Sequence, residues 1–346
     1  MGTHVLVTGH RGYIGSVLVP QLLEAGYDVT GADTDYYQGC TLSPEPVSVP
    51  WIRKDVRDIS PHDLEGFDAL IHLAALSNDP VGNLNSAWTD EINYVASARL
   101  AASAKSAGVR RFLFASSCIM YGMSAADVAT EETPLDPRTA YARSKMLSEQ
   151  AIAALADDGF SPTFLRNGTV YGASPRMRFD TVLNNLVGSA LTLGEVLVQS
   201  DGKPWRPVVH IHDVARAFVA ILQAPSAAVH NQAFNVGSNH LNYTILELAQ
   251  IATDTVPGCR LRVLAQPDAD QRTYRADFSK FARTFPGFSF AFDPKGGALD
   301  LRETLMGLRL TRDLFADKRF SRIRWLKYLL ESDILDHTLR WHHDGT

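Results

Sequence analysis

Cysteine is scarce in this chain: the three residues, Cys40, Cys118 and Cys259, are widely spaced and odd in number. They form neither a disulfide framework nor the spacing of metal ligands, so no metal site is expected and a reducing cytoplasm is the expected location. Basic runs are missing as well, and 33 Lys and Arg against 38 Asp and Glu give a net charge of −5. This balance argues against a surface that binds nucleic acid.

Long apolar runs are also absent. No stretch approaches the roughly 18 apolar residues that a membrane-spanning helix needs, and no charged segment precedes the first predicted strand, which begins at His4. Neither membrane insertion nor export is therefore expected. What the chain does have is length: 346 residues, of which 45% are hydrophobic, suffice for one large domain and a smaller one.

Strand-like and helix-like segments alternate along the first half of the chain. Short apolar runs such as HVLVTG, FDALIHLAA and RRFLFAS are separated by segments of helical periodicity. The alternation predicts an α/β fold with a Rossmann-type doubly wound parallel sheet, in which ligands bind beyond the carboxyl ends of the strands. After Gly172 the periodicity becomes less regular, which indicates a smaller mixed α/β lobe for the substrate.

A glycine-rich turn, TGHRGYIG, follows the first predicted strand. Gly9, Gly12 and Gly15 leave no side chains where the chain turns into a helix, so a pyrophosphate can approach the helix N-terminus. Asp33 ends the next strand, where a carboxylate accepts hydrogen bonds from both ribose hydroxyls and repels a 2′-phosphate. These residues predict a dinucleotide site that favours NAD, whereas the guanidinium of Arg11 suits a phosphate and favours NADP.

A candidate proton-transfer group lies further along the chain. Tyr141 and Lys145 are four residues apart and share a helix face, so the lysine ammonium is expected to depress the pKa of the phenol from about 10. Ser117 ends an earlier strand, and its hydroxyl can hold the same substrate oxygen. A phenolate that removes a hydroxyl proton, beside a dinucleotide that accepts hydride, predicts oxidation and reduction at a carbon that bears a hydroxyl.

The order of glycine turn, acidic strand end, serine strand and YxxxK resembles the extended short-chain dehydrogenase/reductase superfamily, from His4 to about Lys280. Within it, the chain is most similar to the NAD-dependent nucleotide-sugar epimerases and dehydratases of the UDP-galactose 4-epimerase type. The resemblance implies that Ser117, Tyr141 and Lys145 are catalytic. It also implies a cofactor site made by Gly9, Arg11, Gly12, Tyr13, Ile14, Gly15, Asp33, Asp55, Val56, Leu73, Ala74, Ala75, Tyr141 and Lys145.

The two positions after the serine separate the reactions of this superfamily. Sugar 4,6-dehydratases carry Asp and Glu there, as the acid and base that eliminate water, whereas this chain has Cys118 and Ile119. Since isoleucine cannot exchange a proton, the resemblance favours an epimerase over a dehydratase. Cys118 is a further catalytic candidate because a thiol with a shifted pKa exchanges protons, and a packed apolar role is the alternative.

The resemblance further implies a nucleotide-diphosphate sugar as the substrate. His72 and His210 are expected to have structural roles. Guanidinium and amide groups would hold the diphosphate and the sugar. The expected contacts are Ser77, Asn78, Ser117, Asn167, Arg178, Asn185, Arg206 and Arg272.

The change in composition after Gly172 also suggests domain boundaries. Residues 1–172 plus about 207–240 would form the NAD-binding domain, and about 173–206 and 241–346 would form the nucleotide-sugar-binding lobe. The Arg-rich tail, residues 311–341, has the pattern of amphipathic helices, which are expected to cover the lobe, with a subunit contact as the alternative. A homodimer is expected.

Together these features predict an NAD-dependent nucleotide-sugar epimerase, which oxidises a sugar hydroxyl to a transient ketone and returns the hydride to the other face. The alternatives are an NAD(P)-dependent nucleotide-sugar reductase, oxidase or dehydratase, and a non-catalytic NAD(P)-binding sensor. The intact set of Ser117, Tyr141 and Lys145 argues against the sensor, because a sensor needs no proton-transfer residues.

Overall fold

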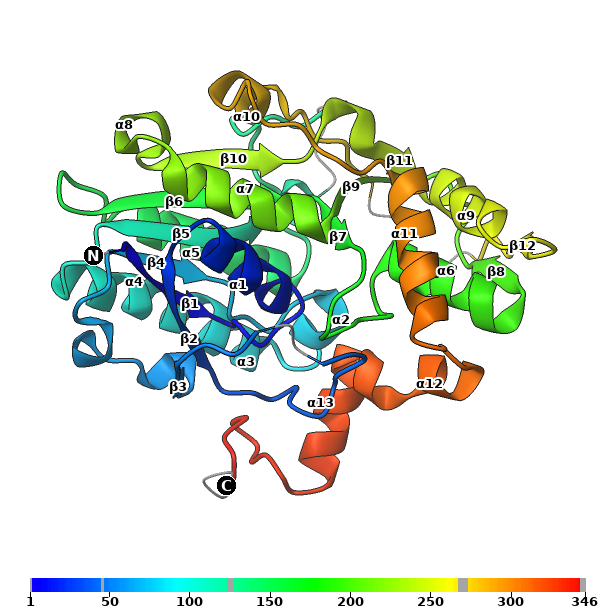
Figure 1. The fold of residues 1–346 in the computed structure, drawn as a ribbon, viewed down its shortest axis with the longest axis horizontal. Helices are drawn as coiled ribbons and strands as arrows, with labels where there is room; N and C mark the ends of the chain where they lie inside the picture. The colour runs from blue at the N-terminus through cyan, green and yellow to red at the C-terminus, as the bar shows by residue number, and fades with distance from the viewer. Residues whose placement is uncertain (1, 45–46, 123–126, 267–272, 343–346) are drawn as a thin grey trace.

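The computed structural model describes residues 2–44, 47–122, 127–266 and 273–342 (Figure 1). In this part of the chain the main sheet has seven strands, all parallel, in the order β10-β6-β5-β4-β1-β2-β3, which confirms the predicted fold class. The strands are β1 (His4–Thr8), β2 (Asp28–Asp33), β3 (Trp51–Arg53), β4 (Ala69–His72), β5 (Arg111–Ser117), β6 (Ser161–Asn167) and β10 (Gln232–Val236). Because β4 and β2 lie on opposite sides of β1, the strand order reverses there, and a crevice at the carboxyl ends of β1 and β4 is the expected ligand site.

Alternating side chains in the strands build an apolar layer on each face of the sheet. In β1, Val5 and Val7 face one side and Leu6 faces the other, and all three are fully buried. Helices α1 and α7 cover the first face, and α4 and α5 cover the second (Figure 1). The helices of this region are α1 (Gly15–Glu24), α2 (Asp79–Gly82), α3 (Ser86–Thr89), α4 (Ala96–Ser106), α5 (Ala140–Ala153), α7 (Ile211–Gln223) and α8 (Ser226–Val229).

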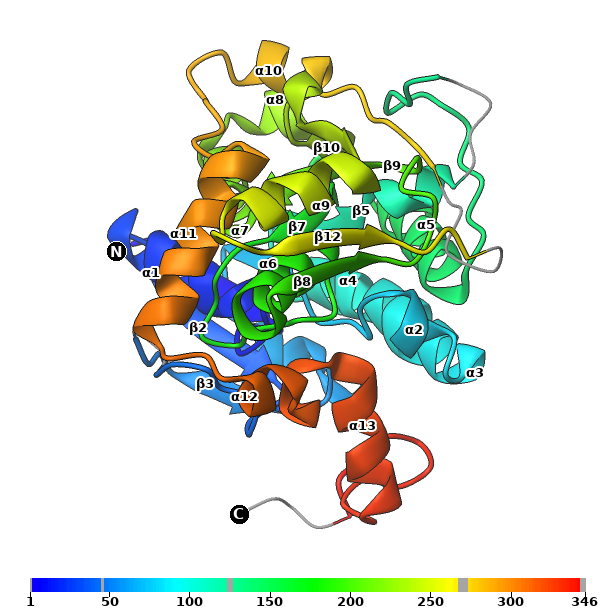
Figure 2. The same cartoon turned by 90° about the vertical axis from the view of Figure 1, so that its right-hand side faces the viewer.

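A smaller lobe carries two short sheets, β11-β9-β7 and β12-β8, which lie beside helices α6 and α9 (Figure 2). The strand β9 pairs in parallel with β7 and antiparallel with β11, so the lobe is mixed, as predicted. Its strands are β7 (Thr169–Tyr171), β8 (Glu195–Val198), β9 (Trp205–His210), β11 (Asn242–Thr244) and β12 (Arg260–Val263). The remaining helices are α6 (Val182–Leu193), α9 (Ile245–Asp254), α10 (Ser279–Thr284), α11 (Pro294–Gly307), α12 (Arg312–Ala316) and α13 (Arg322–Glu331).

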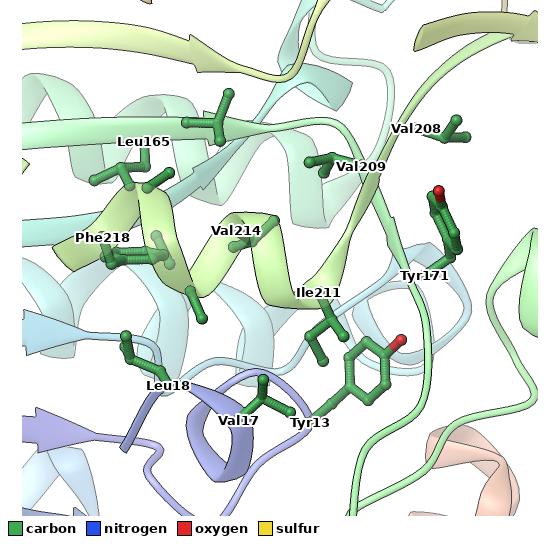
Figure 3. Packing of buried hydrophobic residues seen from close by; sticks show 14 of the residues in the cluster. Tyr13, Val17, Leu18, Leu165, Tyr171, Val208, Val209, Ile211, Val214 and Phe218 are labelled. Carbon is green, nitrogen blue, oxygen red and sulfur yellow. The ribbon is translucent and has the colours of Figure 1, made fainter. Parts of the chain in front are cut away.

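One apolar layer is continuous from the main sheet into this lobe. Leu18 of α1, Phe218 of α7 and Leu165 of β6 belong to the same buried cluster as Val208 of β9 and Tyr171 of β7 (Figure 3). The lobe and the main sheet therefore share a core. No described helix is long and apolar enough to cross a membrane.

The C-terminal tail packs against α2 and the segment that follows β2, which differs from the prediction that it covers the lobe. Leu326 and Leu329 of α13 are buried in the cluster that contains Leu6 of β1. The indole Nε1 of Trp325 donates to the carbonyl oxygen of Tyr36 at 2.8 Å. The apolar face of α13 thus completes the core on the side of α4 and α5, so the predicted assignment of residues 241–346 to the lobe does not hold for this helix.

Candidate active site

The glycine turn lies between the carboxyl end of β1 and the start of α1. A Cβ atom on Gly15 would lie 2.3 Å from the carbonyl oxygen of Gly9. A Cβ atom on Gly9, whose φ is +73°, would lie 2.7 Å from the amide nitrogen of Ala74. Side chains are excluded at both positions, and the turn lines a pocket of about 150 Å³. This cradle at a helix N-terminus fits a pyrophosphate.

The same pocket brings together the residues predicted for the cofactor. Tyr141 and Lys145 line the neighbouring pocket instead. The predicted residues in the walls of the first pocket are Gly9, Arg11, Gly12, Tyr13, Ile14, Gly15, Asp33, Asp55, Val56, Leu73, Ala74 and Ala75.

Asp33 is positioned by backbone donors on either side. Its Oδ2 accepts the N–H of Arg11 at 3.0 Å, and its Oδ1 accepts the N–H of Asp35 at 2.8 Å. Burial raises the pKa of Asp33 to about 6, so the group is a carboxylate at neutral pH. The guanidinium of Arg11 is paired with Asp35, with Nε 3.0 Å from Oδ2, and lies 5.2 Å from the ring centroid of Trp51. Asp35 therefore neutralises the positive charge of Arg11, which would otherwise favour the 2′-phosphate of NADP.

Asp55 is held by a cation of the chain itself. Arg57 donates from Nε at 2.9 Å and from Nη2 at 2.7 Å to the two carboxylate oxygens. Burial alone would raise the pKa of Asp55, but its contacts with Arg57 lower the pKa below the usual range. Asp55, the expected adenine contact, is therefore held in place and ionised in the wall of the pocket.

A second pocket of about 410 Å³ adjoins the first, and the two share lining residues such as Ser77 and Arg178. Ser117, Tyr141 and Lys145 line this second pocket together. The serine ends β5, whereas the tyrosine and lysine come from α5. The parallel sheet thus unites in space the three groups that the sequence separates.

Helix α5 and strand β5 hold the lysine between them. The hydroxyl of Thr139 caps α5 by accepting the N–H of Ala142 at 3.1 Å. Lys145 Nζ lies 5.9 Å from the ring centroid of Tyr141 and donates to the carbonyl oxygen of Ala115 at 2.7 Å. The lysine is therefore tied to the strand that ends in the serine.

Burial decides the ionisation of the tyrosine and lysine. It raises the pKa of the Tyr141 phenol well above the usual value, and the carboxylate of Asp79 adds to this shift. Burial also lowers the pKa of Lys145 to about 7. The prediction that Lys145 depresses the pKa of the phenol is thus corrected, because the removal of a phenolate from water dominates and the positive charge that opposes this rise comes from Arg178.

Cys118 lies away from both pockets, contrary to the catalytic role predicted for it. Its thiol is fully buried, and Sγ donates to the carbonyl oxygen of Arg166 at 3.1 Å. Burial raises the pKa of the thiol far above its usual value, so the group stays protonated. Ile119 lines the second pocket in its place. The structure gives Cys118 the packed role.

Arg178 connects the two pockets. Its Nε donates to Asp180 Oδ1 at 2.8 Å, and its Nη1 donates to the hydroxyl of Ser77 at 2.9 Å. Asn78, which has a φ of +78°, donates from Nδ2 to Asp180 Oδ2 at 3.2 Å. Three residues predicted to bind substrate therefore form one hydrogen-bonded network in the wall of the second pocket.

Asn167 and Arg206 line the second pocket as well. The amide of Asn167 donates to the carbonyl oxygen of Ser116 at 3.4 Å, and its Oδ1 is buried without a hydrogen-bond partner among the described residues. The guanidinium of Arg206 lies 5.7 Å from the ring centroid of Tyr274. An amide oxygen and a guanidinium thus border the space beside the catalytic group.

One predicted substrate contact is not brought into this site. Asn185 is exposed on α6 and donates to the carbonyl oxygen of Phe179 at 3.0 Å. The preceding Asn184 points inward and accepts the N–H of Gly172 at 2.9 Å, because neighbours on a helix point about 100° apart. Arg272 lies outside the described residues.

Sequence reasoning missed two residues that shape the site. Asn93, in the π-helical segment Asp90–Val95, binds the N–H and the carbonyl of Leu76 at 2.8 and 3.0 Å. Asp79 lines the second pocket and accepts the hydroxyl of Thr139 at 2.5 Å. The run SNDP indicates a helix start after β4, but nothing in it distinguishes a carboxylate that lines a pocket from one in solvent.

The two histidines set aside as structural are buried. His72 links the hydroxyls of Thr8 and Ser97 at 2.6 and 2.7 Å, and burial lowers its pKa to about 3. Burial lowers the pKa of His210 to about 3 as well. Both rings are therefore neutral at physiological pH. In the part of the chain that is described, no group of three or more His, Cys, Asp or Glu residues could hold a metal ion.

Comparison with known proteins identifies the family to which these features belong. The profile of the NAD dependent epimerase/dehydratase family matches residues 5–237. The chain belongs to this family. It is therefore an enzyme whose cofactor is NAD, and the glycine cradle and the carboxylate of Asp33 fit that dinucleotide.

Curated and solved members of the family resemble this chain over most of its length. The UDP-glucose 4-epimerase of Corynebacterium glutamicum is 31% identical over an alignment of 267 residues, which covers 72% of this chain and 79% of that protein. The structure of TunA, an NAD-dependent NDP-hexosamine 5,6-dehydratase, matches with a TM-score of 0.79 and 25% identity over 90% of this chain and 99% of its own. The structure of MoeE5 with UDP-glucuronic acid and NAD matches with a TM-score of 0.76 and 27% identity over 88% of this chain and 99% of its own.

Proposed function

We propose that this enzyme is a nucleotide-sugar epimerase, which oxidises a sugar hydroxyl to a transient ketone and returns the hydride to the opposite face. The observation that carries the proposal is the lining of the second pocket. Ser117, Tyr141 and Lys145 meet there, and the residue that follows the serine strand into the wall is Ile119 rather than an acid. The similarity to a UDP-glucose 4-epimerase supports this reaction.

Each catalytic side chain has a distinct task in this reaction. The positive charges of Lys145 and of bound NAD would favour loss of the Tyr141 proton to solvent, and the phenolate then takes the proton of the substrate hydroxyl and later returns it. The hydroxyl of Ser117 holds the same substrate oxygen. Lys145, with its pKa of about 7, can supply a positive charge beside the phenol. NAD, when bound, accepts and returns the hydride, and its oxidised ring adds positive charge to the site.

The substrate is proposed to occupy the second pocket with its diphosphate near two arginines. Arg178 and Arg206 both line that pocket, and each guanidinium group can donate two parallel hydrogen bonds to a phosphate. We further propose that residues 1–172 and about 207–240 form the cofactor domain and that the protein assembles as a homodimer. Sedimentation equilibrium of the purified protein tests the dimer.

The reaction is tested by its mass balance. Mass spectrometry of ligands released from the purified protein, with a thermal-shift screen of UDP-, GDP-, CDP- and dTDP-sugars, identifies the substrate. The enzyme is then incubated with that sugar in deuterated water. An epimerase gives a product of unchanged mass, no deuterium at carbon and no net NADH.

The variant Tyr141→Phe should lower turnover by about 10²–10⁴-fold and leave NAD affinity and folding nearly unchanged, because it removes only the proton-transfer oxygen. Full activity of this variant would contradict the assigned role of Tyr141. A product lighter by one water, or net release of NADH, would instead assign a dehydratase or an oxidase.

A dehydratase is the second candidate, and the position of Asp79 favours it. The carboxylate lines the second pocket together with Tyr141, so both side chains border the space proposed for the substrate. TunA, which resembles this chain, is a 5,6-dehydratase. If the product lacks water, Asp79→Asn should abolish that loss while transient NADH still forms.

A further inference from the structure

Two buried arginines face the cofactor pocket with N–H groups that have no hydrogen-bond partner among the described residues. Arg178 is 7% exposed and Arg322 is 2% exposed. Nη2 of Arg178 and Nη1 of Arg322 are both buried and unsatisfied, and both side chains line the pocket of the glycine turn. A buried donor without an acceptor is costly, so the site is built for a ligand that accepts hydrogen bonds.

The charges around these arginines point to an anion. Asp180 accepts Nε of Arg178 at 2.8 Å and the backbone N–H of Arg322 at 2.9 Å, so its carboxylate pairs with the guanidinium of Arg178 and meets Arg322 through the backbone. Burial, and next the charge of Arg178, lower the pKa of Arg322. Nη2 of Arg322 donates to the carbonyl oxygen of Arg176 at 2.9 Å. This leaves Nη1 of Arg322 without an acceptor among the described residues, at the wall of the pocket.

The position of Arg322 favours the anion of the cofactor over that of the substrate. Arg178 lines both pockets, whereas Arg322 lines only the pocket of the glycine turn. Its guanidinium lies over the ring of Tyr37, 4.3 Å from the centroid, and its charge also acts on the phenol of Tyr13 in the glycine turn. The anion that this turn fits is a pyrophosphate.

We propose that Arg322 donates a hydrogen bond from Nη1 to the pyrophosphate of NAD, and that α13 thereby forms the wall of the cofactor site opposite the glycine turn. The family match ends at residue 237, so this contact comes from a segment that the family profile does not include. The helix is held for this task by Leu326 and Leu329 in the core and by the hydrogen bond of Trp325 to Tyr36.

The proposal is tested with Arg322→Met and with Arg324→Met as a matched control, since Arg324 is exposed on the same helix. Calorimetric titrations use NAD, ADP, adenosine and UDP. Loss of a hydrogen bond to a charged group predicts binding of NAD and ADP that is about tenfold to hundredfold weaker in Arg322→Met. Adenosine and UDP should bind as to the unmutated protein, and Arg324→Met should change nothing.

Equal weakening of NAD, ADP and adenosine would overturn the proposal, because it would show that Arg322 only supports the fold. Weaker binding of UDP alone would show that Arg322 binds the substrate rather than NAD, and would overturn the proposal as well. A second measurement needs no variant: hydrogen exchange of α13 amides in the unmutated protein. ADP should slow this exchange and adenosine should not, whereas equal protection by both would refute a phosphate contact.

Discussion

Burial, more than neighbouring charge, sets the ionisation of the reactive side chains. Lys145 is 3% exposed, and its removal from water lowers its pKa to about 7. Burial raises the pKa of the Tyr141 phenol, so the phenol keeps its proton. Above pH 7 the pair therefore holds no net charge, and the fold avoids the cost of a buried ion until a ligand supplies charge of its own.

Replacement of Lys145 by Met is expected to stabilise the protein at neutral pH. The folded pKa of about 7 lies below the value of 10.5 for an ordinary lysine, so between these values the unfolded chain binds more protons. The free energy of unfolding contributed by Lys145 therefore rises with pH in this window. The advantage of Lys145→Met should shrink by about 2 kcal/mol between about pH 7 and about pH 9.

Urea unfolding at the two pH values measures this difference between the variant and the unmutated protein. Lys327→Met serves as the control, because Lys327 is exposed on α13. A difference that stays constant with pH would show that Lys145 keeps its ordinary pKa in the folded protein.

Asp33 is expected to set the preference for NAD. The variant Asp33→Asn removes the charge that repels a 2′-phosphate, so the ratio of NADP to NAD affinity should rise by about tenfold. Titration of both cofactors against both proteins measures the ratio. Asp28→Asn, at the exposed start of β2, is the matched control. Tighter binding of NADP by the unmutated protein would show that Arg11, rather than Asp33, decides the choice.

Residues whose relation is local could be predicted from the sequence, and residues that depend on distant contacts could not. Tyr141 and Lys145 line one pocket because a helix turn brings them together. Asn185 was misplaced because the direction of α6 relative to the pocket depends on packing against other elements. The sequence gives no signal for Arg322, since the carbonyl group that it binds belongs to Arg176, 146 residues away in the sequence.

At the scale of elements, the glycine turn is fixed by contacts that tolerate no side chain. A Cβ atom on Gly15 would come within 2.6 Å of two backbone atoms of His10 and within 2.3 Å of the carbonyl oxygen of Gly9. Because backbone atoms cannot move aside, the start of α1 would have to shift. The pyrophosphate site depends on that start.

Gly15→Ala is therefore expected to reduce NAD affinity by at least about a hundredfold and to destabilise the fold by about 1–3 kcal/mol, as overpacking does. Gly287→Ala is the matched control, because a Cβ atom there would meet no atom within 4 Å. Calorimetric titration of NAD and thermal unfolding of both variants measure the two effects. Normal NAD affinity in Gly15→Ala would mean that the turn can open without loss of the site.

The strands of the main sheet could be predicted, because alternating or continuous apolar runs mark them directly. The segment Asp90–Val95, by contrast, is a π-helix. Its wider turn accompanies the buried hydrogen bonds of Asn93 to Leu76. Such a change in helix type depends on tertiary contacts, which a period of 3.6 residues does not report.

In the whole molecule, the hydrophobic core does not follow the predicted boundary between the cofactor domain and the lobe. Val5 of the main sheet shares one buried cluster with Val187 of α6, Leu248 of α9 and Leu301 of α11. The opposite face is completed by the tail, through residues such as Leu326. A core that crosses the boundary in this way favours unfolding as one unit.

We therefore expect a single thermal transition, in which the calorimetric enthalpy equals the van't Hoff enthalpy. Leu326→Ala should lower the stability of that whole transition by about 2–5 kcal/mol, because it leaves a cavity where a fully buried side chain packs in the core. Leu193→Ala, at a position that is 47% exposed, should change it by less than about 0.5 kcal/mol. A second transition that appears in Leu326→Ala, with the main transition unchanged, would show that the tail unfolds independently of the sheet. In that case α13 would be a separable cover, and the cofactor contact assigned to Arg322 would depend on how often the cover is closed.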